Sequence, residues 1–169
     1  MYDYHLSDPT LTTWTLIRQT WSAMNKAAEG KLAKVGLTPE RLNVLWLCRD
    51  YRGKLIPAEL SRLTFRENQT IAGMLNRMES EGLARRVPKR KGKPFTEVQI
   101  TDKGKEAVGP GIEVLNALIT NIMSSLSVED HEQLQKILRV LQNNLVEELR
   151  LELKPPPGYA PAETVPVNW

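Results

Sequence analysis

The middle of the chain switches between two spacings of its hydrophobic residues. Over residues 66–82 the apolar side chains recur every three or four positions, which is typical of an amphipathic helix with one buried face. The members of this face are Ile71, Met74, Leu75 and Met78. Residues 57–63 predict a shorter helix, and residues 64–66 predict the turn that joins the two. Together these segments predict a helix-turn-helix.

After Gly82 the spacing changes to that of strands. Val98 and Ile100 alternate with polar residues, so residues 95–101 predict a strand with one buried face, and residues 83–88 predict its partner. Residues 89–94 between them form a basic hairpin tip. A helix-turn-helix followed by a two-stranded hairpin is a winged helix, and the predicted fold class is mainly α, with a small β component.

Long apolar stripes flank this unit. Residues 8–35 predict one helix with Thr10 or Thr12 as its N-cap and Gly36 at its end. A second helix follows Thr38 and Pro39, which suit a cap and a first turn. The stripe of the first helix consists of Leu11, Trp14, Ile17, Trp21, Met24 and Ala28.

The second half of the chain ends in two more predicted helices. Residues 101–126 predict a helix that the segment 109–111 (Gly-Pro-Gly) should kink or interrupt. Ser127 caps the last helix, with Asp130 where a capping box prefers Glu. The prolines that follow Lys154 favour an extended tail. The seam of the last helix consists of Leu134, Ile137, Leu138, Leu141, Leu145 and Leu149.

The composition argues against several classes of protein, among them membrane proteins and enzymes. The chain has 169 residues, 41% hydrophobic and 25% charged, with a net charge of +3. No apolar run approaches the ~18–20 residues that cross a bilayer, and the first residues lack signal-peptide regions, so we expect a cytoplasmic protein without a membrane partner. One cysteine and two distant histidines offer little for a metal or nucleophilic site. We therefore expect no enzyme, no metal and no cofactor.

The polar face of residues 66–82 is rich in amides and small residues. Such side chains can donate to and accept from base edges in the DNA major groove, although an ordinary solvated surface has the same character. Candidate base contacts are Asn68, Gln69, Thr70, Gly73 and Asn76, with Arg66 and Arg77 placed for phosphates or guanine. The hairpin tip adds Lys89, Arg90, Lys91 and Lys93, which we expect at phosphates or in the minor groove.

The order of these parts resembles the MarR (multiple-antibiotic-resistance regulator) family of winged-helix transcription factors. The resemblance covers roughly residues 10–150 and rests on three motifs. These are Leu37-Thr38-Pro39 before Val44-Leu45, then Leu75-Asn-Arg-Met-Glu79-x-x-Gly82-Leu83-x-Arg85, and Ile100-Thr101-x-x-Gly104. The stretches Leu63-Thr-Phe-Arg-Glu67 and Leu75–Glu79 also look like a subgroup from bacteria that respire halogenated organic compounds.

The resemblance implies a homodimeric repressor that binds a near-palindromic operator and is released by a small aromatic or halogenated aromatic ligand. It divides the chain into an N-terminal arm with the first dimerisation helix (1–36), a DNA-binding lobe (37–101), C-terminal dimerisation helices (102–153) and a Pro-rich tail (154–169). The two apolar seams then form the two-fold interface, unless a monomeric bundle covers them. At the wing, family members carry Asp-x-Arg where this chain has Gly92-Lys93-Pro94.

Three further interpretations stay open. A ligand cavity would be lined by Trp14, Trp21, Trp46 and Tyr51 with Arg18 or Arg49 for a carboxylate, unless these aromatics only pack the core. Cys48 is either a redox sensor or a buried, inert thiol. The alternative function is a winged-helix protein-interaction module that does not read DNA.

Overall fold

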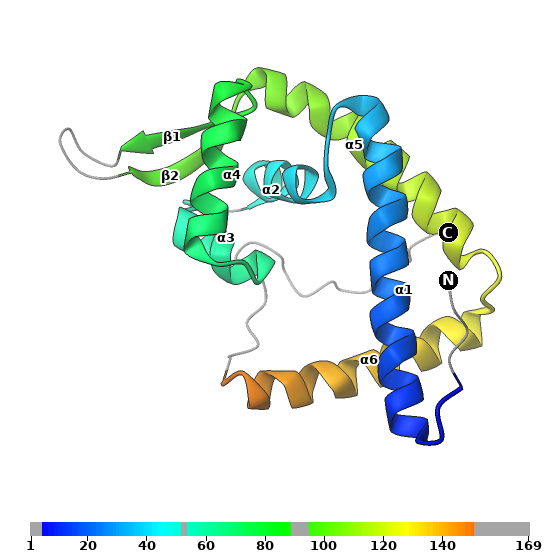
Figure 1. The fold of residues 1–169 in the computed structure, drawn as a ribbon. Coiled ribbons are helices and arrows are strands. Elements are labelled where there is room, and N and C mark those ends of the chain that lie inside the picture. Colours follow the sequence, from blue (N-terminus) through cyan, green and yellow to red (C-terminus); the bar gives the residue numbers. More distant parts are fainter. Residues whose placement is uncertain (1–4, 52–53, 89–94, 151–169) are drawn as a thin grey trace.

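The computed structural model describes residues 5–51, 54–88 and 95–150. Within them the chain folds into six α-helices, a short 3-10 helix and a two-stranded sheet, which confirms the winged-helix fold. The lobe contains α2 (Pro39–Asp50), α3 (Pro57–Thr64), α4 (Asn68–Ser80), β1 (Ala84–Pro88) and β2 (Phe95–Ile100). Figure 1 shows α1 (Pro9–Leu32) and α5 (Asp102–Met123) extending from this lobe, with α6 (Val128–Glu148) away from it.

Helix starts follow the local chemistry of their caps. Thr38 begins α2 as predicted, because its Oγ1 accepts a hydrogen bond from the Arg41 N–H at 3.3 Å. Ser127 begins α6, where Ser127 and Asp130 form a complete capping box. At α1 the predicted caps Thr10 and Thr12 are wrong. The cap is Asp8, whose carboxylate accepts from the Thr10 N–H at 2.7 Å while Pro9 occupies the first turn.

Residues 109–111 were predicted to kink or interrupt the helix, and the interruption is wrong. α5 is a single helix of 22 residues that contains Pro110. Gly111 is buried, and a Cβ there would lie 2.8 Å from side-chain carbons of Leu37 and Leu42. The helix therefore continues because it packs closely against α2 and the residues before it, which outweighs the local cost of proline.

The wing is joined to the lobe at both of its ends. β1 and β2 pair antiparallel, with Ala84 opposite Ile100 and an irregularity between Val87 and Pro88. On the other edge of β2, the Val98 N–H donates to the Leu55 carbonyl at 2.7 Å. At the base of the wing, Thr101 Oγ1 donates to the Gly82 carbonyl at 2.6 Å and accepts from the Gly104 N–H at 3.1 Å.

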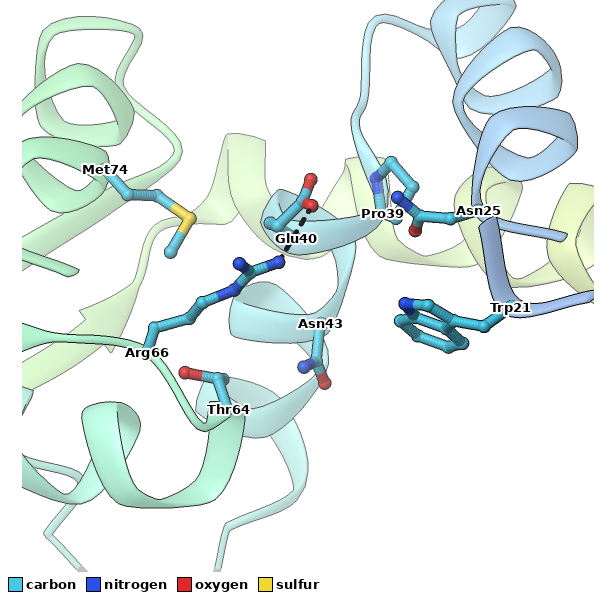
Figure 2. Close-up of a pocket in the computed structure, with 8 residues that line it drawn as sticks. All are labelled: Trp21, Asn25, Pro39, Glu40, Asn43, Thr64, Arg66 and Met74. Carbon is cyan, nitrogen blue, oxygen red and sulfur yellow. Dashed lines mark ion pairs between the residues drawn. The ribbon is translucent and has the colours of Figure 1, made fainter. Parts of the chain in front are cut away.

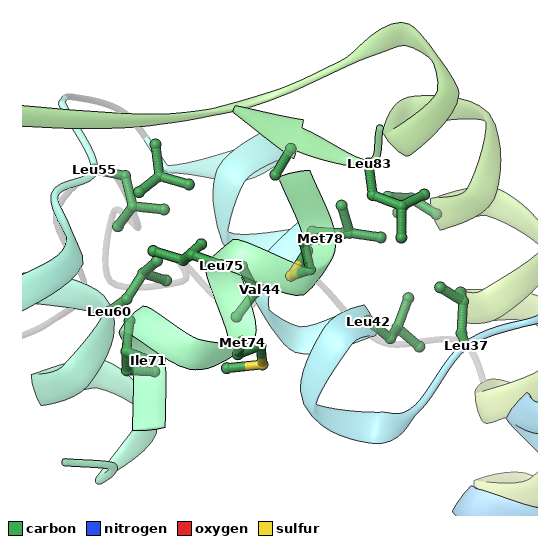
Figure 3. Close-up of a cluster of buried hydrophobic side chains, with 14 of the residues drawn as sticks. Leu37, Leu42, Val44, Leu55, Leu60, Ile71, Met74, Leu75, Met78 and Leu83 are labelled. Carbon is green, nitrogen blue, oxygen red and sulfur yellow. The ribbon is translucent and has the colours of Figure 1, made fainter. Parts of the chain in front are cut away.

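The hydrophobic core lies inside the lobe (Figure 3). Its fully buried large side chains come from the three lobe helices and from α1 and α5: Leu32, Leu42, Val44, Leu45, Leu60, Ile71, Leu75, Met78 and Val108. By contrast, the first half of α1 and the seam of α6 are exposed. No single helix in the described ranges is long and apolar enough to cross a membrane, and α5 with α6 meets that test only as a pair bent by 105°.

Candidate nucleic-acid interface

The turn between α3 and α4 is held in a fixed conformation. Phe65 adopts a left-handed backbone with φ 52°, and the Arg66 N–H donates to the Ser61 carbonyl at 3.1 Å. The Ser61 hydroxyl donates to the Arg66 carbonyl as well. A non-glycine residue in this region is strained, so the surrounding hydrogen bonds keep α4 at a set angle to α3. The sequence offered no glycine to mark this turn.

α4 separates its apolar and polar residues as the spacing predicts. Its apolar stripe is buried, and five of the candidate DNA contacts on this helix are exposed: Asn68, Gln69, Thr70, Asn76 and Arg77. Gly73 lies in the middle of this outward face, and a Cβ there would meet no atom within 4 Å. The face is therefore narrow at its centre and lined by hydrogen-bonding groups, which suits close approach to base edges.

On one side of this face lies an arginine-lined hollow of about 490 Å³. It includes Arg41, Arg66 and Arg77 with the hydroxyl-bearing residues Thr38 and Thr70. Arg41 forms an ion pair with Glu81 at 2.7 Å, and Arg66 lies 3.6 Å from Glu40. Guanidinium and hydroxyl groups together are the usual partners of phosphate oxygens.

Arg66 also borders a second hollow, of about 200 Å³, between α1, α2 and α4 (Figure 2). Its lining includes Trp21 and Asn25 from α1, Asn43 from α2 and Met74 from α4. Figure 2 shows Arg66 and Trp21 on opposite sides of Glu40 and Pro39. The structure therefore places Arg66 beside the start of α2, between the two hollows, and not within α4.

On the other side, Arg86 of β1 ties the wing to α4. Its guanidinium Nε donates to Glu79 Oε2 at 2.9 Å, and its Nη2 donates both to Glu79 and to the amide oxygen of Asn76. The Arg86 side chain, by these hydrogen bonds, lowers the pKa of the Glu79 carboxyl, and Glu79 raises the pKa of Arg86. Sequence reasoning missed this link, because it joins two elements across a turn.

The remaining basic candidates belong to the wing. Lys89, Arg90, Lys91 and Lys93 lie outside the described residues. At the base of the hairpin, Arg85 donates to Gln99 Oε1 from Nε at 3.2 Å and from Nη2 at 3.0 Å. This pair crosses from β1 to β2 and fixes the two strands in register.

The candidate ligand residues have different surroundings in the structure. Trp21 lines the smaller hollow, whereas Trp14 and Arg18 are exposed on α1. Trp46 donates from its indole to Asp50, which also pairs with Arg49 at 2.6 Å. The Tyr51 hydroxyl donates to Glu59 Oε1 at 3.3 Å.

Cys48 is partly buried and packs against the hydrophobic core. Burial raises the pKa of its thiol to about 12, so the reactive thiolate is scarce at neutral pH. Among the described residues, no group of three or more His, Cys, Asp or Glu side chains is placed to hold a metal ion.

The chain is similar in sequence to a known transcriptional repressor. No protein-family model matches the chain. It is similar to the HTH-type transcriptional repressor IacR of Pseudomonas putida, 27% identical over 117 residues that cover 69% of this chain and 70% of that protein.

Solved structures agree with this similarity. The organohalide-sensing transcriptional regulator RdhR, in its ligand-free form, has a TM-score of 0.76 and 21% identity, covering 92% of this chain and 96% of that chain. The C80S mutant of MarR from E. coli, in complex with operator DNA, has a TM-score of 0.72 and 19% identity, covering 82% of this chain and 99% of that chain. The chain has the fold of the MarR family regulators, as the order of its sequence motifs indicated.

Proposed function

We propose that this chain is a MarR-type transcriptional repressor that binds a near-palindromic DNA operator as a homodimer. The observation that carries the proposal is the outward face of α4. Its amides and hydroxyl surround Gly73, with the arginine-lined hollow on one side and the wing on the other. The amides and the hydroxyl of α4 can meet base edges, and the arginine-lined hollow can meet phosphates.

The homodimer is supported by the apolar residues that one chain leaves uncovered. Trp14 and Trp21 on α1 are 62% and 66% exposed. Eight large apolar residues of α6 and its C-cap, including Ile137 and Leu145, are at least 36% exposed. Exposed apolar residues in such number are typical of an interface, and a two-fold axis would present two α4 helices to successive major grooves.

Binding to DNA can be tested by fluorescence anisotropy with the DNA upstream of the chain's own gene. We expect saturable binding that survives excess nonspecific competitor. Arg77→Ala should weaken binding about tenfold, since it removes one charge beside α4. Glu147→Ala, a substitution at the end of α6, serves as the matched control and should bind as the wild type does. Binding that competitor abolishes would favour the protein-interaction module instead.

The wing can be tested with Arg90→Ala combined with Lys91→Ala. We expect weaker binding and a flatter dependence of affinity on salt, because fewer counterions are released. An unchanged salt slope would contradict a role of the wing tip in binding.

We further propose that a small aromatic ligand binds in the hollow between Trp21 and Arg66. An indole provides an apolar wall, and a guanidinium provides a partner for a phenolate or carboxylate. RdhR is also known in a form bound to 2,4-dichlorophenol. Such a ligand would release DNA by favouring lobe positions that do not match successive grooves.

This ligand proposal is tested by titrating 2,4-dichlorophenol against tryptophan fluorescence. We expect quenching that Trp21→Phe removes. Trp14→Phe is the matched control, because Trp14 lies on the same helix but does not line the hollow. Equal quenching in the two variants would contradict this site.

A further inference from the structure

Asn76 and Gln69 are both exposed amides on α4, but they differ in their hydrogen bonds. The Oδ1 atom of Asn76 accepts a hydrogen bond from Arg86 Nη2. Among the described residues no hydrogen bond is recorded for the Gln69 amide. Gln69 can therefore turn either its oxygen or its nitrogen outward, whereas Asn76 is oriented by a neighbour.

The orientation of Asn76 follows from the chemistry of its partner. A guanidinium has only donors, so the atom of Asn76 that faces Arg86 must be the amide oxygen. Arg86 is itself held by Glu79, which accepts from its Nε at 2.9 Å and from its backbone N–H at 2.5 Å. The Arg86 side chain is only 18% exposed, so solvent competes weakly for this arrangement.

The Nδ2 hydrogens of Asn76 are consequently the atoms left for a partner outside the chain. Among the described residues, no acceptor for them is recorded. Asparagine recognises adenine by accepting from N6 and donating to N7 at once, which needs both amide atoms. In this protein the oxygen that would accept from adenine is turned toward the wing.

We propose that Asn76 reads DNA as a hydrogen-bond donor, and that Arg86 is the positioning residue that makes it so. This inference rests on the proposed function, and it names the base that the site selects. Guanine presents two adjacent acceptors, N7 and O6, in the major groove, and thymine presents O4. Asn76 therefore selects guanine first and thymine second, and it disfavours adenine and cytosine.

The test is selection of duplexes from a library with a randomised core by the full chain, followed by sequencing. For the wild type we expect one symmetry-related pair of positions that prefers guanine about tenfold over adenine. Asn76→Ala should remove the preference at those positions alone. Gln69→Ala, the matched control, should change a different position and leave this one intact.

Two variants separate the donor role from mere contact. Asn76→Asp keeps an oxygen for Arg86 but has no hydrogens to donate, so it should lose the guanine preference about tenfold and gain cytosine, whose N4 donates. Arg86→Lys keeps a positive charge beside Glu79 without the fork that reaches Asn76, so adenine should become as good as guanine. Circular dichroism of both variants verifies that the lobe is folded.

The outcomes distinguish this inference from the proposed function. A wild-type protein that enriches no sequence would overturn the DNA-binding function and this inference with it. Enrichment in which the Asn76-dependent position is adenine, or is unchanged in Arg86→Lys, would overturn the inference alone.

Discussion

The winged-helix lobe and helix α6 carry similar apolar stripes but cover them to opposite extents. In the lobe, Leu60, Ile71 and Leu75 are fully buried. On α6, the seam residues that the sequence marks are between 36% and 56% exposed, with Leu141 and Leu149 at these limits. The core of the lobe is therefore formed within one chain, whereas the seam of α6 is left uncovered in it. Similar hydrophobic spacing can thus give a buried core or an exposed apolar face.

The largest effect should come from the lobe core. Leu75→Ala should lower the free energy of unfolding by about 4 kcal/mol, because it removes buried carbons and leaves a cavity. Urea denaturation followed by circular dichroism measures this loss. Since the cavity lies within one chain, the loss should be the same at every protein concentration.

Leu145→Ala is the matched change in the seam, and it sharpens the comparison. In the isolated chain Leu145 is 52% exposed, so its truncation should cost the lobe little. In the proposed homodimer it weakens association, and its cost to stability should therefore depend on protein concentration. Light scattering at several concentrations follows the dimer, and a Leu145→Ala protein that is as dimeric as the wild type would break the comparison.

Glycines give the next largest effect, and they compare the inside of the lobe with its outward face. A Cβ at Gly104 would lie 2.1 Å from the Leu83 carbonyl oxygen, so Gly104→Ala should destabilise the protein by about 2 kcal/mol. At Gly73 the same change meets nothing, and it should stabilise α4 by about 0.5–1 kcal/mol. Thermal melts measure both, and we expect Gly73→Ala to bind DNA less well although it is more stable.

The smallest expected effect concerns the link between the wing and α4. Because hydrogen bonds from Arg86 lower the pKa of Glu79 from its ordinary 4.5, the charged carboxylate stabilises the folded state. This contribution, about 1 kcal/mol, is complete above pH 4.5 and is lost as the pH falls through the lowered pKa. Glu79→Gln should therefore be less stable than the wild type at pH 7, and the difference should shrink below pH 4.5. A constant difference across that range would contradict the assignment.

Local signals predicted most element boundaries, and where they were misread a stronger signal was present. Thr38 before Pro39 and Asp8 before Pro9 are the same arrangement of a cap and a first-turn proline. This arrangement predicts the cap of α2 correctly, and at α1 it favours Asp8 over Thr10 and Thr12. The true cap of α1 is therefore visible in the sequence.

Long-range packing could not be predicted in the same way. Pro110 favours a broken helix when only its neighbours are considered, but the contact of Gly111 with Leu37 and Leu42 involves residues about seventy positions away. The link from Arg86 to Asn76 is also invisible to periodicity, because it depends on how β1 leaves α4. Spacing thus predicted which face of α4 is polar, but not which of its amides is free to turn.

Because α5 is unbroken, a small tilt of this helix would change the spacing of the two proposed DNA-reading surfaces. Its 22 residues, at a rise of 1.5 Å each, give a rod of about 33 Å between the base of the wing and the turn before α6. A tilt of about 5° at one end moves the other end of such a rod by about 3 Å. Successive major grooves repeat at about 34 Å, so in the proposed homodimer small changes where the two chains meet would be enough to set the two lobes in or out of phase with DNA.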